Sequence, residues 1–141
     1  MKPPTDEQLN EEVNDGYGLQ YEGEPSWLIK AELDLKEAEI DALEITREMV
    51  ADRWRTEEKF LLMVVRHHEL ALELEMDWMD EVDQDAVTME QDRLNAAKEK
   101  HATEKREYED GEKRAIEAIE LKKRELAVIS DVLRRSHNGN F

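Results

Sequence analysis

Two short segments of the chain carry side chains of the kinds that bind metal ions. The first is the adjacent pair His67-His68. Di-metal sites in helical bundles place a Glu three residues before each His, and valines occupy both of those positions here. His68 also begins a His-Glu pair, but Leu72 stands where the zinc-protease motif needs its second histidine. Because neighbouring histidines project about 100° apart on a helix, they cannot share one ion. We interpret His68 as a residue at the edge of a helix interface.

The second segment is the acidic run of Asp80, Glu81, Asp83 and Asp85. A calcium loop needs a glycine after its third acidic position, where this chain has Ala86, and a glutamate further on. The chain also has no cysteine, no G-x-S-x-G motif and no glycine-rich phosphate loop. The sequence therefore predicts an acidic turn, no metal ligands, no catalytic residues, no cofactor and no enzymatic activity.

The net charge of −17 is unevenly distributed along the chain. Residues 1–25 carry seven acids and one lysine, and residues 26–85 carry 18 acids and seven bases. Residues 86–141 carry 12 of each sign, without a basic patch. Such a chain repels nucleic acid and anionic lipid over its first two thirds, so we expect no direct binding to nucleic acid or to a membrane.

The composition favours long helices. Charged residues make up 40% of the chain and aromatic residues 6%, and neither Gly nor Pro occurs between Ser26 and Asp110. The first residues lack the basic lead and apolar stretch of a signal peptide, and no apolar run approaches the roughly 20 residues of a membrane span. We expect a soluble, cytoplasmic protein.

The punctuating residues divide the chain into three parts. Residues 1–25 contain two glycine-rich breakers and predict a flexible N-terminal arm, although Tyr17, Leu19 and Tyr21 could dock on a partner. Residues 26–136 form the helical domain. Ser26 is a suitable N-cap for a helix over about 26–83, and a turn near 83–88 leads to a second helix that could break at 110–111. Residues 137–141 predict a frayed tail.

The first helix carries two apolar stripes. One follows the 3-4 spacing of coiled-coil a and d positions, and we call it the a/d seam; its members are Leu28, Ala31, Leu35, Ala38, Ala42, Ile45 and Met49. The second stripe lies beside it and consists of Leu33, Ile40, Leu43, Val50 and Trp54. One partner helix cannot cover both stripes, and three alanines in the seam permit a close approach.

These patterns predict an all-α fold: an elongated antiparallel helical hairpin or bundle with coiled-coil character, completed by oligomerisation, with a homodimer as the expected assembly. The predicted function is that of a structural or regulatory protein–protein interaction protein. Its predicted partner-binding residues are the apolar side chains Leu28, Leu35, Ala42, Ile45, Met49 and Trp54.

Two alternative functions stay open. From His67 to Asp92 the chain contains ten acids and neither Lys nor Arg. An inhibitor that mimics DNA, of the kind that phages and mobile elements carry, could use such a patch to occupy the groove of a basic nucleic-acid-binding protein. The eight acids of residues 69–85 span roughly 25 Å, about one per 3 Å, against one per 1.7 Å for DNA. The residues of this acidic patch are Glu69, Glu73, Asp77, Asp80, Glu81, Asp83 and Asp85. The third function is that of a component of a virion or other large assembly, which would use the N-terminal arm.

Overall fold

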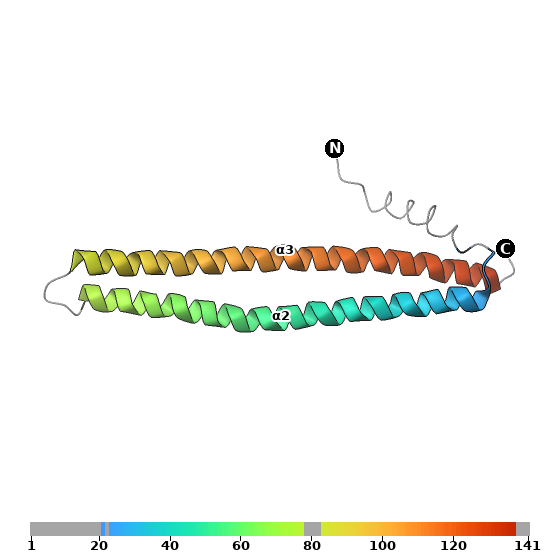
Figure 1. The fold of residues 1–141 in the computed structure, drawn as a ribbon, viewed down its shortest axis with the longest axis horizontal. Coiled ribbons are helices and arrows are strands. Elements are labelled where there is room, and N and C mark those ends of the chain that lie inside the picture. The colour runs from blue at the N-terminus through green and yellow to red at the C-terminus, as the bar shows by residue number, and fades with distance from the viewer. Residues whose placement is uncertain (1–20, 22, 78–82, 138–141) are drawn as a thin grey trace, which may run out of the picture. The chain divides into compact units, whose positions relative to one another are not determined.

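The computed structural model describes residues 21, 23–77 and 83–137. Two α-helices account for nearly all of them: α2, Ser26–Asp77, and α3, Gln84–His137. The two helices pack against each other as a helical hairpin (Figure 1), and no strand occurs among the described residues. The predicted all-α hairpin is therefore confirmed, whereas oligomerisation stays a prediction.

The helices of the hairpin run antiparallel. Ser26 contacts Ser136, Glu39 contacts Lys122 and Glu58 contacts His101, so residue numbers rise on α2 as they fall on α3. By its contacts the chain divides into two compact units. The first unit comprises residues 1–47 and 114–141, and the second comprises residues 48–113.

The start of α2 differs in detail from the expected N-cap. α2 begins at Ser26, but the carbonyl oxygen of Pro25 accepts the first helical hydrogen bond, from Ile29 N at 3.2 Å. The Ser26 hydroxyl instead forms a hydrogen bond of 2.7 Å with the Ser136 hydroxyl on α3. Ser26 therefore links the two helices of the first unit.

The N-terminus of α3 is capped by Asp83. Its Oδ1 accepts hydrogen bonds from the backbone N–H groups of Asp85 and Ala86, at 3.0 and 3.3 Å. Those donors have no partner within the helix, and an Asp at this position satisfies them. Asp83 lies in the turn that the sequence predicts near 83–88. The helix therefore starts at Gln84, earlier than the expected start near residue 88.

The core of the first unit contains Tyr21 together with apolar residues of both helices. The fully buried side chains are Ile29 on α2 and Ile129 and Val132 on α3, and Tyr21 packs with them. Tyr21, the one described residue of the three that could dock on a partner, therefore contributes to the core of the first unit. Residues 1–20, including Tyr17 and Leu19, lie outside the described residues.

The second unit has a smaller apolar core, made by Leu61 and Val65 of α2 and Leu94 of α3. The charged middle of α3 adds an aromatic layer to it. Trp54 stacks on His101 with ring centroids 6.4 Å apart and on Tyr108 at 5.3 Å. Polar-tipped aromatic rings thus supply part of the packing where α3 lacks aliphatic residues.

Two glycines differ in backbone conformation: Gly111 is helical, whereas Gly23 has a positive φ. α3 continues through Asp110 and Gly111, so the break considered at 110–111 does not occur, and a Cβ added at Gly111 would meet no atom within 4 Å. Gly23 has a φ of +81° in a turn that the hydrogen bond from Glu24 N to Tyr21 O closes. Only Gly adopts such a φ readily.

We expect Gly111→Ala to raise the free energy of unfolding by about 1 kcal/mol, because Ala is the better helix former and has room here. Gly23→Ala is the matched control and should lower it by about 1–2 kcal/mol because of its positive φ. Urea unfolding followed by circular dichroism measures both. A loss of stability in Gly111→Ala would instead support a helix break at this residue.

Candidate protein interface

The a/d seam lies on an uncovered face of α2. In the first unit, Leu35 and Ile45 expose 54% and 58% of their surface, and the three seam alanines are exposed as well. Leu28 is half-buried. Met49, the last seam residue, lies in the second unit and is 67% exposed. Exposed aliphatic side chains at regular helical spacing form a candidate docking surface for another helix.

The second stripe is the one that α3 covers. Leu33 and Ile40 are buried, and Leu43 is half-buried. Ile29 and Leu33 belong to the same buried cluster as Val128 and Ile129 of α3. At 3.6 residues per turn, Leu33 and Ile40 occupy nearly the opposite side of α2 from the a/d seam, which corrects the expectation that the two stripes lie beside each other. The hairpin therefore forms through one stripe and leaves the other outside.

Acidic side chains line both sides of the seam in the first unit. Glu32 and Glu39 follow d positions, and Asp34 and Asp41 precede a positions, which places the two pairs on opposite flanks. Asp34 pairs with Lys30 at 2.7 Å, and Glu39 accepts a hydrogen bond from Lys122 at 3.0 Å. Glu32 and Asp41 make no ion pair with any described residue. The seam flanks thus carry four carboxylates and no basic residue.

The second unit exposes a further apolar stripe on α2 that is not among the predicted partner-binding residues. Phe60 and Met63 are 65% and 69% exposed, and Leu70 and Leu74 are also exposed. Their spacing of 3, 7 and 4 residues is compatible with a heptad repeat, and this was the signal available in the sequence. Asp52 and Thr56 interrupt the apolar pattern between Met49 and this stripe.

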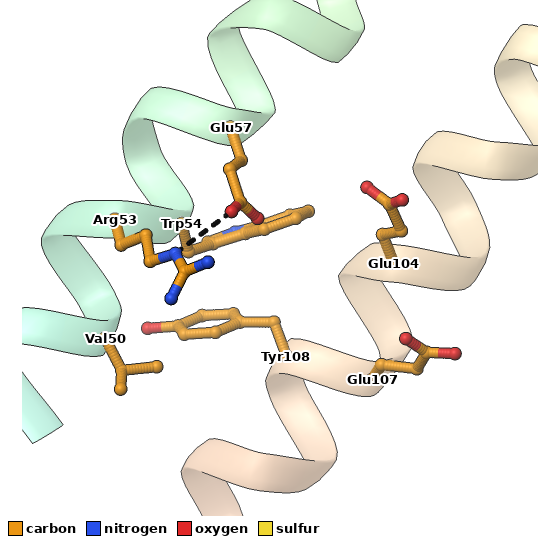
Figure 2. A pocket seen from close by; sticks show the side chains of 7 residues that line it. All are labelled: Val50, Arg53, Trp54, Glu57, Glu104, Glu107 and Tyr108. Atoms are coloured by element: carbon orange, nitrogen blue, oxygen red, sulfur yellow. Dashed lines mark hydrogen bonds and ion pairs between the residues drawn. The ribbon is translucent and has the colours of Figure 1, made fainter.

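Trp54, predicted to bind a partner, packs inside the second unit instead. Its indole is half-buried and stacked between rings of α3, so it contributes to the hairpin's own contact. Figure 2 shows the Tyr108 ring against the indole. The two rings lie beside a surface hollow of about 420 Å³. The residues that line the hollow are Val50, Arg53, Trp54, Glu57, Glu104, Glu107 and Tyr108. Arg53 pairs with Glu57 at 3.2 Å, so the Glu57 carboxylate already offsets the positive charge of its guanidinium.

The acidic patch is only partly described. Asp80 and Glu81 lie outside the described residues, whereas Glu73, Asp77 and Asp85 are exposed. Glu69 pairs with Arg66 at 3.3 Å. Asp83 caps α3. Two residues of the patch therefore have local structural roles.

The histidines contact glutamates across the hairpin. His68 Nδ1 lies 3.4 Å from Glu90 Oε2, and His101 Nε2 lies 3.1 Å from Glu58 Oε2. Hydrogen bonds from Arg93, chiefly, and from His68 lower the pKa of Glu90 below its ordinary 4.5. His68 of α2 thus contacts Glu90 of α3 at the edge of the interface between the two helices. Within the described ranges, no three His, Asp or Glu side chains are grouped as metal ligands would be.

The described residues contain no helix with an apolar stretch long enough to cross a membrane.

The fold is that of an all-α helical hairpin. No protein-family model, curated protein or solved structure matches the chain.

The cross-helix pair of Glu39 and Lys122 predicts a pH dependence. The hydrogen bond from Lys122 is the main cause that lowers the pKa of Glu39 below its ordinary 4.5. A lowered pKa in the folded state stabilises the fold above about pH 4.5, and this stabilisation is lost as the pH falls through the folded-state pKa. The stability lost in Glu39→Gln should therefore be largest near neutral pH and should shrink below about pH 4.5.

The matched control is Glu48→Gln, which removes an exposed α2 carboxylate that makes no ion pair with any described residue. Urea unfolding from about pH 3 to pH 7 measures both variants against the original protein. Equal pH dependence of the two differences would show that the Lys122 contact does not stabilise the fold.

Proposed function

We propose that this chain is a non-enzymatic interaction protein that binds helices of other polypeptide chains through the a/d seam of α2. The observation that carries the proposal is the position of the seam. Leu35, Ala38, Ala42 and Ile45 repeat at coiled-coil spacing and stay exposed after α3 has covered the opposite face.

The area left open is energetically relevant. Complete burial of a Leu or Ile side chain contributes about 1.5–3 kcal/mol, so the exposed halves of Leu35 and Ile45 leave about 1 kcal/mol each for association. Three alanines let a second helix approach closely, which increases the contacts of the larger residues. The seam therefore suits a helical ligand of several turns, whose binding sums many small contributions.

The two alternative functions rest on other parts of the chain. A DNA-mimicking inhibitor would use the acidic patch of residues 69–85, whose density of charge on the described residues supports contact with a basic protein. A component of a large assembly would use residues 1–25, most of which lie outside the described residues. Neither alternative accounts for the exposed seam, and so we favour helix binding.

A photo-crosslinking amino acid at position 38 tests the proposal. In extracts of cells that naturally contain the protein, we expect it to link α2 to a helical segment of another polypeptide. Position 118 is the control, because Ala118 is exposed on α3 in the same unit. Equal yields of intermolecular product at the two positions would contradict the proposal.

Leu35→Asp separates binding from folding. Because Leu35 is already more than half exposed, this change should lower the free energy of unfolding by only about 1 kcal/mol. It should nevertheless abolish the crosslink from position 38, since it places a charge in the centre of the seam. Circular dichroism and urea unfolding of the same samples show that the hairpin persists.

A further inference from the structure

We propose that the helix docked on the first unit's seam is a basic amphipathic helix of a different protein, with apolar residues against the seam and Lys or Arg on both flanks. This inference rests on the proposed function and identifies the chemistry of the partner. The surface concerned runs from Leu28 to Ile45 on α2.

The charges beside the seam carry the argument. In a pair of helices packed through a and d positions, the residues on either side of the seam face the corresponding residues of the other helix. Here these flanking residues include Glu32, Asp34, Glu39 and Asp41, without one Lys or Arg. Lys122 offsets Glu39 and Lys30 offsets Asp34, but Glu32 and Asp41 make no ion pair with any described residue. A complementary helix therefore carries positive charge on both flanks.

The same charges disfavour a second copy of α2 as the partner. In a parallel pair, Asp34 of one copy would face Glu39 of the other. In an antiparallel pair the flank of Asp34 and Asp41 would face itself. Both arrangements place acid against acid, which is the means by which helix pairs reject wrong partners.

α3 of a second copy does not offer a suitable ligand either. Its described large apolar residues that remain exposed are Met89, Ile116 and Leu121, which do not form a repeating stripe. Charge complementarity to the four flanking carboxylates therefore favours a basic helix of another protein.

The size of the seam sets the length of the ligand. The seventeen steps from Leu28 to Ile45 correspond to about 26 Å at 1.5 Å per residue, so roughly three heptads suffice to cover it. Because Ala31, Ala38 and Ala42 are small, bulky residues of the ligand can lie against them.

Two synthetic 21-residue peptides test the inference. Both carry Leu at a and d positions; one has Lys and the other Glu at every flanking position, and both are labelled with fluorescein. Fluorescence anisotropy with the full chain at low salt should show at least roughly tenfold tighter binding of the Lys peptide. This preference should shrink at high salt, where exposed charges are screened.

A charge reversal on the protein provides the decisive variant. Glu32→Lys combined with Asp41→Lys should reverse the preference, so that the Glu peptide binds more tightly. The control is Glu117→Lys with Glu120→Lys, which makes the same change in net charge on exposed positions of α3 in the same unit. The control variant should still prefer the Lys peptide. It should bind this peptide somewhat more weakly, because its net charge is less negative than that of the original protein.

The outcomes separate this inference from the proposed function. Equal binding of both peptides, blocked by Leu35→Asp, would retain helix docking and overturn the basic partner. The chain could instead form a dimer that binds neither peptide and that Leu35→Asp dissociates. This result would retain helix docking, overturn the basic partner and assign the seam to a second copy. Binding of neither peptide by a monomeric chain would overturn both proposals.

Discussion

One geometric constraint determines most of this structure: α2 carries apolar residues on two opposite faces, and α3 can cover only one of them. Ile29, Leu33 and Ile40 repeat at intervals that keep them on one side of α2, and α3 buries that side. The a/d seam repeats with the same period on the other side. A hairpin of two helices therefore satisfies half of the apolar pattern and leaves the remainder on the surface.

The two units maintain the hairpin by different chemistry. In the first unit, Lys36 pairs with Glu125 and Lys122 with Glu39, both at 3.0 Å, around an aliphatic core. In the second unit, the cross-helix pairs join His68 to Glu90 and His101 to Glu58. The difference follows from α3, whose middle has few aliphatic residues and packs on Trp54 through rings instead. The side chains of these pairs are partly buried, with 11–37% of their surface exposed, and they lie around the apolar contacts that join the two helices.

Local signals predicted the helices well and their contacts less well. The long stretch without Gly or Pro indicated α2, and the turn predicted near 83–88 indicated approximately where α3 starts. Gly111 shows the limit of such signals, because a helix tolerates one glycine when its neighbours favour helix. Periodicity identified both stripes of α2, yet it could not determine which stripe α3 would cover. That choice depends on long-range packing with Ile129 and Val132, which only the folded chain brings to α2.

The candidate interface could be located in sequence only in part, for the same reason. Leu35 and Ile45 were identified from spacing alone, but spacing is identical for a buried stripe and an exposed one. Trp54 belongs by its spacing to the second stripe, and the prediction that it binds a partner could not foresee the contact of its indole with His101 and Tyr108 of α3.

The charges beside the seam affect which helix can cover it. An uncovered apolar stripe normally promotes association between copies. In a parallel contact of α2 with a second copy, Asp34 would face Glu39, and in an antiparallel contact the flank of Asp34 and Asp41 would face itself, so acid opposes acid in both. The same carboxylates attract a helix of opposite charge. In the helix-binding function that we propose, these carboxylates distinguish a basic foreign helix from a second copy by their position beside the a/d seam.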